Sequence, residues 1–207
     1  MVDAVTGVLL AGGKSRRMGQ DKRFLSVGSG TLLELGLRTL QSLFKAVVIV
    51  IAQDSEPLQA DVPVLRDLLP NTGSLGGLYT GLNQAATEHV FAVACDMPLL
   101  IPATIEYMAA LRFDMDVVMA QRPTGFQPMH AFYGKRCLPV MEEMLAKREL
   151  KIQQLANHPA LRSRIVTADE LNGIDPEGRS FVNVNTPADL EVAKEWLRRS
   201  AKGEVSA

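Results

Sequence analysis

The first apolar run of the chain ends in a basic, glycine-rich segment: residues 5–23 read VTGVLLAGGKSRRMGQDKR. The run from Val5 to Ala11 has the Val and Leu content of a strand buried on both faces, and Gly12-Gly13 interrupts it. Residues 14–23 contain five basic residues and one acid, a local charge of +4. Glycines let backbone N–H groups approach an anion, and Lys and Arg neutralise phosphate oxygens. This stretch therefore predicts a first strand followed by a loop that binds a phosphorylated ligand.

Two other phosphate-binding motifs do not fit this loop. Gly13-Lys14-Ser15 imitates the end of a P-loop, but the first glycine of that motif would fall on Val8. The Gly-x-Gly-x-x-Gly dinucleotide fingerprint is also missing from the loop. The sequence thus disfavours a dinucleotide-dependent oxidoreductase.

Strand and helix patterns alternate along the rest of the chain. Residues 46–52 and 89–95 are apolar runs like the first, and they are separated by segments with helical spacing. Helices are predicted to begin near Thr31 (a capping box with Glu34), Gly73, Pro102, Pro139 and Thr186. This alternation predicts an α/β sandwich on a mostly parallel sheet. We expect an antiparallel element in the C-terminal half, from about Asp116 onwards, and place it at an edge of the sheet.

Length and composition bound the remaining possibilities. The chain has 207 residues and a net charge of −1, so no global basic field exists to hold a nucleic acid. Apolar runs of about seven residues are too short to span a membrane, and the N-terminus lacks the basic region of a signal peptide. Cys95 and Cys137 have no metal-ligand spacing, which favours a reducing, cytoplasmic location. We expect one domain, residues 1–199, and a flexible tail, residues 200–207.

Residues 10–22, of the form Leu-Ala-Gly-Gly-x-Ser-x-Arg-Met-Gly-x-Asp-Lys, are similar to the signature of the molybdenum cofactor guanylyltransferases, the MobA family. That family belongs to a wider group of nucleotidyltransferases with a three-layer, Rossmann-like fold. Related cytidylyltransferases usually carry Ala-Ala-Gly where this chain has residues 11–13. The resemblance implies that the loop wraps the triphosphate of GTP and that Arg17 and Lys22 hold its phosphates and the leaving pyrophosphate.

A second match lies at residues 67–77, DLLPNTGSLGG, which resemble the family's Asp followed by Gly-Pro-Leu-Ala-Gly. Ser74 replaces the Pro and Gly76 replaces the Ala. A helix N-terminus offers free N–H donors, and an Asp accepts from the N1–H and amino group of guanine. Gln53 stands where the family uses an Asn. The GTP-binding residues implied are Leu10, Ala11, Gly12, Gly13, Lys22, Gln53, Asp67, Gly73, Leu75 and Asp96.

Further matches follow the third apolar run and fill the C-terminal half. Asp96, directly after that run, resembles the Asp of the family's Cys-Asp-x-Pro, which implies that it holds Mg²⁺, with Mn²⁺ as an alternative. Residues 127–133, QPMHAFY, and 181–190, FVNVNTPADL, also resemble family segments. Alternation along the latter puts Asn183 and Asn185 on one face, as candidates to contact the pterin phosphate or the metal shell.

The implied reaction is transfer of GMP from GTP to the terminal phosphate of molybdopterin, with release of pyrophosphate. That phosphate is already ionised, so no general base is needed, and Arg17, Lys22 and Asp96 are the catalytic candidates. Proteins of molybdenum cofactor biosynthesis or acceptor proteins are candidate partners; nucleic acids and membranes are not. The alternatives are a CTP-dependent molybdopterin cytidylyltransferase, a sugar-phosphate nucleotidyltransferase and a non-catalytic GTP-binding regulator.

Overall fold

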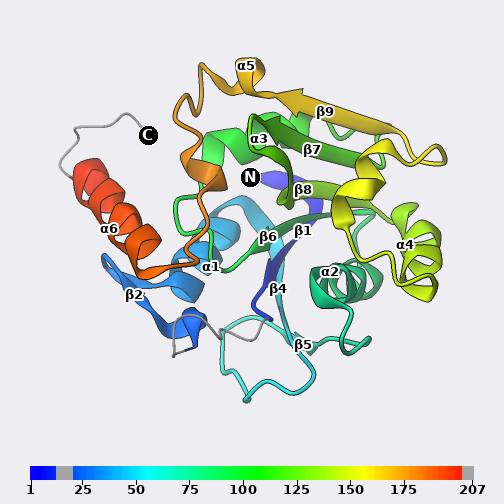
Figure 1. The fold of residues 1–207 in the computed structure, drawn as a ribbon, viewed down its shortest axis with the longest axis horizontal. Coiled ribbons are helices and arrows are strands. Elements are labelled where there is room, and N and C mark those ends of the chain that lie inside the picture. The colour runs from blue at the N-terminus through cyan, green and yellow to red at the C-terminus, as the bar shows by residue number, and fades with distance from the viewer. Residues whose placement is uncertain (13–20, 202–207) are drawn as a thin grey trace.

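The central strands of the sheet are the apolar runs of the sequence, in a computed structural model that describes residues 1–12 and 21–201. The sheet has seven strands in the order β5-β4-β1-β6-β8-β7-β9 (Figure 1). β1 pairs in parallel with β4 and with β6, as predicted. The strands are β1 (Val2–Leu10), β4 (Phe44–Ile51), β5 (Val64–Arg66), β6 (His89–Ala94), β7 (Val117–Arg122), β8 (Gly125–Gly134) and β9 (Ser163–Thr167).

Helices cover both faces of this sheet and give the three layers. The helices are α1 (Leu32–Leu43), α2 (Gly73–Gln84), α3 (Pro102–Ala110), α4 (Cys137–Ala146), α5 (Ala168–Leu171) and α6 (Pro187–Ala201). α1 and α3 pack on one face, where Leu40 and Ile105 are fully buried, and α2 and α4 pack on the other, with Leu78 and Met141 (Figure 1). The capping box predicted at Thr31 is present. The predicted α/β fold class is therefore confirmed.

The antiparallel element of the C-terminal half is β8, and it lies inside the sheet instead of at the edge where we expected it. A tight hairpin after Arg122 turns β8 back, and β8 then pairs antiparallel with both β6 and β7. The edge strand β9 is parallel to β7. β8 is suited to this interior place because Ala131, Phe132 and Tyr133 are buried on both of its faces. β7 consequently runs in the direction of β1 and β6, and its carboxyl end meets theirs.

Short elements complete the fold. The hairpin of β2 (Ser26–Val27) and β3 (Gly30–Thr31) packs with α6 around Val27, Val184 and Ala193. Single turns of 3₁₀ helix lie at Lys22–Phe24 and Arg179–Phe181, and a longer one at Ile152–Asn157. α6 continues through Ala201, so Ser200 and Ala201 of the tail proposed for residues 200–207 are helical, and the rest of that tail lies outside the described residues. Within the described part of the chain, no helix combines the length and hydropathy required to cross a membrane.

Candidate functional site

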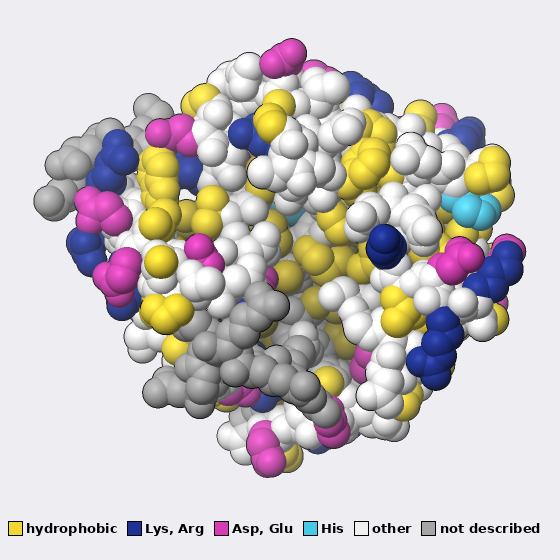
Figure 2. Space-filling model, in the orientation of Figure 1, with side chains coloured by type: hydrophobic (Ala, Val, Ile, Leu, Met, Phe, Trp, Pro, Cys, Tyr) yellow, Lys and Arg dark blue, Asp and Glu magenta, His cyan; other side chains and the backbone are white. Residues whose placement is uncertain are grey.

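Two adjoining cavities lie at the carboxyl ends of the parallel strands, the edge at which ligands bind in open α/β sheets. The larger has a volume of about 650 Å³ and the smaller about 170 Å³. Leu10, Gly12 and Ser74 line both, so the end of β1 and the first turn of α2 form a shared wall. Figure 2 shows a hollow floored by hydrophobic side chains near the middle of this face.

The larger cavity has an acidic group that is held in place by its neighbours. Asp67 follows β5, and its Oδ1 accepts hydrogen bonds from the Leu69 N–H at 2.9 Å and the Thr80 hydroxyl at 3.1 Å. Thr80 Oγ1 in turn accepts from the Leu68 N–H at 3.0 Å. The described residues engage only Oδ1, so Oδ2 is available to a ligand with N–H donors. Gln53, from the loop after β4, lines the same cavity.

The start of α2 forms the opposite wall, and it explains how this chain differs from the family motif. Gly73 has a φ of +61°, in the left-handed region that favours glycine. A Cβ at Gly76 would lie 1.9 Å from Oγ1 of Thr72, whose hydroxyl donates to the Leu69 carbonyl at 2.5 Å. Thr72 therefore occupies the space that an Ala at position 76 would fill. The Leu75 side chain is buried in the core, and Leu75, which the resemblance implied as a GTP-binding residue, lines neither cavity.

The smaller cavity brings together three residues that the sequence singled out separately. The Lys22 ammonium donates to Asn185 Oδ1 at 2.8 Å and lies 3.6 Å from Asp96 Oδ2. Burial raises the pKa of Asp96, and the nearby Lys22 charge opposes that effect. Oδ1 of Asp96 is buried, and no donor among the described residues hydrogen-bonds to it. Lys22 and Asp96 line the cavity, so it contains an ammonium that the Asn185 amide holds from outside the lining and a carboxylate oxygen with unused capacity.

That carboxylate oxygen fits a divalent cation. The described residues contain no group of three or more His, Cys, Asp or Glu arranged to hold a metal ion, so Asp96 would be the main protein ligand there. Mg²⁺ binds proteins through one or two carboxylates and completes its shell with phosphate oxygens and water. The donor set therefore suits a metal that arrives with a polyphosphate.

The C-terminal segment of residues 182–186 reaches the site as extended chain, without joining the sheet. The Val184 N–H donates to the Asp96 carbonyl at 2.8 Å, and Asp189 Oδ2 accepts from the N–H of Asn185 at 2.9 Å. Val184 is buried while Asn183 and Asn185 are exposed, so the predicted alternation holds. Asn185 contacts Lys22, whereas the Asn183 amide donates locally to the Phe181 carbonyl at 3.4 Å. The two Asn residues consequently have different roles.

The segment of residues 127–133 contains a bulge in β8. Met119 pairs with Ala131 and Gln121 with Phe126, so β8 has four residues (127–130) opposite one residue of β7. The buried Tyr133 hydroxyl donates to the Pro128 carbonyl at 2.7 Å and holds this bulge. Bulges re-aim side chains beside functional sites. Here Met129 is directed to the smaller cavity.

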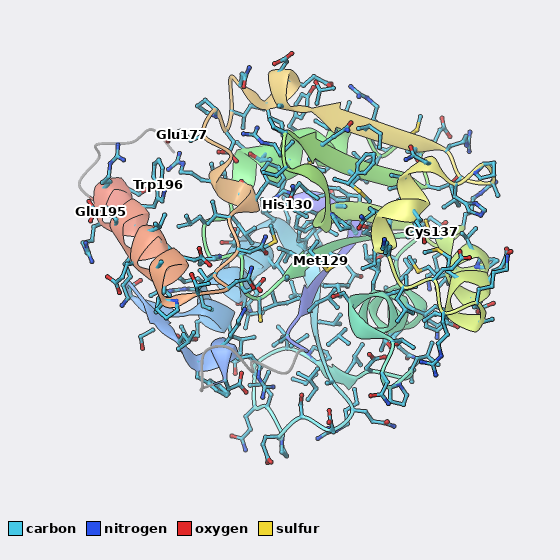
Figure 3. The ribbon with its side chains drawn as sticks, in the orientation of Figure 1. Met129, His130, Cys137, Glu177, Glu195 and Trp196 are labelled. Carbon is cyan, nitrogen blue, oxygen red and sulfur yellow. The ribbon has the colours of Figure 1, made fainter. Side chains whose placement is uncertain are left out.

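His130 follows Met129 but does not line either cavity. Figure 3 labels His130 and Met129 near the centre of the view. The His130 ring packs edge-on against Phe91, with a centroid distance of 5.0 Å, and against Phe181, at 4.7 Å. Burial lowers the pKa of His130 to about 4, so it is neutral near pH 7. Because its ring lines neither cavity, His130 is not placed to take a proton from a ligand there.

Comparison with known proteins decides the family. A model of the MobA-like NTP transferase domain matches residues 7–161, three quarters of the chain. The chain belongs to the MobA-like NTP transferase family.

Relatives of this NTP transferase match nearly its whole length. It is 34% identical to a probable molybdenum cofactor guanylyltransferase of Pelotomaculum thermopropionicum, covering 97% of both chains. It is 35% identical to the molybdenum cofactor guanylyltransferase of Desulfosudis oleivorans, covering 95% of this chain and 98% of that one. The crystal structure of molybdopterin-guanine dinucleotide biosynthesis protein A from Archaeoglobus fulgidus shares the fold, with a TM-score of 0.81 at 23% identity over 94% of this chain and 99% of that one.

The site of this nucleotidyltransferase contains most of the residues predicted for it. Leu10, Gly12, Gln53, Asp67 and Gly73 line the larger cavity, and Ala11, Lys22 and Asp96 line the smaller. Gly13 and Arg17 lie outside the described residues, so their roles stay predictions. The Cys95 thiol lines the smaller cavity, but burial raises its pKa to about 12, which makes it a packing residue.

Sequence reasoning missed several residues of the NTP transferase site. Asp54 and Asn71 line the larger cavity, and Met129 lines the smaller. Asp54 was accessible from sequence, because it directly follows Gln53 at the end of an apolar run. Met129 was not, because an apolar residue within a strand pattern gives no sign that a bulge exposes it.

Proposed function

We propose that the chain transfers GMP from GTP to the terminal phosphate of molybdopterin, releases pyrophosphate and forms the guanine dinucleotide cofactor. The full-length similarity to curated guanylyltransferases supports this reaction. The main structural support for the proposal is that Leu10, Gly12 and Ser74 line both cavities, so that one ligand can occupy the two at once. A bound nucleotide can place its base in the larger cavity beside Asp67 and its phosphates in the smaller cavity beside Lys22 and Asp96.

Guanine complements the larger cavity. The guanine N1–H and amino group are donors, and Asp67 Oδ2 is an acceptor that the described residues leave unengaged. Guanine O6 is an acceptor, and the Gln53 amide and the first-turn N–H groups of α2 are donors. Asp67 is held by the Leu69 N–H and Thr80, so its carboxylate is oriented before the nucleotide binds.

The smaller cavity supplies charge for phosphoryl chemistry. Lys22 places an ammonium beside the phosphates, and Asn185 fixes its direction through the 2.8 Å hydrogen bond. Mg²⁺ or Mn²⁺ held at Asp96 would supply neutralisation of phosphate charge. The acceptor phosphate is already a nucleophile, so the residues need only hold both substrates in line and stabilise the transition state. Arg17, in the loop after β1, would contribute a further positive charge.

We also propose a cytoplasmic location, in keeping with the free thiols of Cys95 and Cys137. Transient partners would be proteins that deliver molybdopterin or accept the finished cofactor.

Purified protein with molybdopterin and each of the four nucleoside triphosphates tests the reaction. We expect pyrophosphate release with GTP and Mg²⁺, formation of the guanine dinucleotide by chromatography, loss of activity in EDTA and recovery with Mg²⁺ or Mn²⁺. A preference for CTP, or transfer to a sugar phosphate, would replace the proposal with another nucleotidyltransferase. GTP binding without turnover in the presence of molybdopterin would favour a regulator.

A further inference from the structure

Arg66 bridges two backbone carbonyls beside the larger cavity. It is the last residue of β5, and its Nη1 donates to the carbonyl of Gln53 at 2.7 Å and to that of Ser55 at 3.0 Å. A guanidinium is planar and presents several N–H donors in fixed directions, so one side chain can hold two carbonyls at once. The described lining residues of the two cavities do not include Arg66 itself.

The segment that Arg66 holds is irregular chain between two strands. Residues 52–63 connect β4 to β5 without helix or strand, a long connection for a compact domain. One hydrogen bond, from the Ser55 N–H to the Ala52 carbonyl at 3.1 Å, closes a turn at its start. Gln53 and Asp54, inside that turn, line the larger cavity.

The end of β5 therefore sets two walls of the larger cavity. β5 pairs with β4 over three positions, the last of which joins Ile51 to Arg66. The next residue, Asp67, donates its N–H to the Ile51 carbonyl at 2.8 Å and directs its carboxylate into the cavity. Arg66 reaches back over the same strand end and fixes the turn that carries Gln53. Two adjacent residues thus shape the cavity: Asp67 supplies a carboxylate, and Arg66 holds the turn that carries the Gln53 amide.

We propose that Arg66 is a positioning residue for the nucleotide base: it holds residues 53–55 in the conformation that lets Gln53 and Asp54 contact the base. It acts through these neighbours and makes no contact with the nucleotide. This inference rests on the proposed function for the identity of the base. The ordering of residues 53–55 by Arg66 does not depend on substrate, so it can be tested in the protein without nucleotide.

Three variants test the proposal. Arg66→Ala removes both hydrogen bonds, and because their effect reaches the base only through the turn, we expect the Kd for GTP to rise by about 3- to 10-fold, the scale of one net hydrogen bond. Arg66→Lys retains the charge and can hold one carbonyl, so we expect an intermediate Kd. Arg38→Ala, an exposed Arg on α1 outside both cavities, is the matched control and leaves the Kd unchanged. The kcat of Arg66→Ala at saturating GTP stays near that of the wild type, because the phosphate side is intact.

A second measurement needs no substrate. Hydrogen exchange of the Ser55 amide in the free protein becomes faster in Arg66→Ala if Arg66 orders the turn. Faster exchange together with a raised Kd for GTP, measured by calorimetry with GTP alone, supports the proposal. Unchanged exchange overturns it, and so does faster exchange with an unchanged Kd. Failure of the proposed function would instead be seen as normal GTP binding in the wild type without guanylyl transfer to molybdopterin.

Discussion

Replacing Asp96 by Asn separates the activity of this carboxylate from its effect on stability. Asn has nearly the same shape, so the change removes the charge and preserves the packing. Burial raises the pKa of Asp96 in the folded chain, which means that the folded state binds the proton more tightly than the unfolded state. The ionised carboxylate therefore costs stability at neutral pH, and this cost falls as the pH is lowered. The neutral amide in the variant Asp96→Asn does not carry this cost in stability.

The expected changes have opposite directions. Desolvation of a buried polar group costs about 1–3 kcal/mol and more when the group is charged, so the neutral amide avoids the part of this cost that the charge of Asp96 adds. Loss of the attraction to Lys22, 3.6 Å away, offsets part of the gain. The net result is a stabilisation of about 1 kcal/mol, or a rise in Tm of about 2–4 °C for a chain of this size. Meanwhile kcat/KM falls by about 100-fold or more, because a preorganised charge at the phosphates is lost.

Thermal melts in EDTA at pH 7 and pyrophosphate release with GTP measure the two effects. Asp116→Asn is the control, because Asp116 is also buried but accepts from the Arg162 N–H at 2.8 Å and lies 3.3 Å from Arg136 Nε. It precedes β7, at the strand end remote from the cavities. This variant should lose about 1 kcal/mol of stability and keep its kcat/KM. A fall in Tm for Asp96→Asn similar to that of the control, or a loss of activity below 10-fold, would refute the reasoning.

Three further predictions concern the site and its surroundings. Lys22→Ala should lower turnover by about 100-fold, and Asn185→Ala by about 10-fold through loss of the 2.8 Å bond that directs Lys22; equal kinetics for wild type and Asn185→Ala would remove Asn185 from the site. Gly76→Ala should destabilise the chain by about 1–3 kcal/mol because its Cβ would lie 1.9 Å from Thr72 Oγ1, and adding Thr72→Ala should restore part of the loss in denaturant titrations, since the Leu69 carbonyl oxygen at 3.0 Å still crowds the Cβ. His130 has a lowered pKa of about 4, so the unfolded chain binds a proton at this residue first, and the free energy of unfolding falls as the pH drops from about 6.5 to 4. His130→Phe should flatten this pH dependence of stability. An unchanged slope of stability against pH would contradict the lowered pKa of His130.

Local patterns were sufficient to predict most of the fold. The buried runs that became β1, β4 and β6 are continuous and apolar because strands covered on both faces have no solvent side. The start of α1 was readable because its capping box consists of residues three positions apart. β5 escaped prediction because three residues give too short a pattern, and the interior position of β8 depends on a hairpin that returns between two other strands.

The sequence by itself determined the fold class, the family signature of residues 10–22 and the placement of Asp96 at a strand end, because each depends on neighbours in the chain. The tertiary structure decided how the site is assembled. Lys22 and Asn185 are 163 positions apart, and the hydrogen bond from Val184 to the Asp96 backbone brings Asn185 to Lys22. The Arg66 bridge and the Thr72–Gly76 fit likewise depend on backbone geometry in three dimensions. Such contacts leave no periodic signal in one sequence. Residue types therefore predicted the chemistry of the site, whereas packing determined which side chains come together in it.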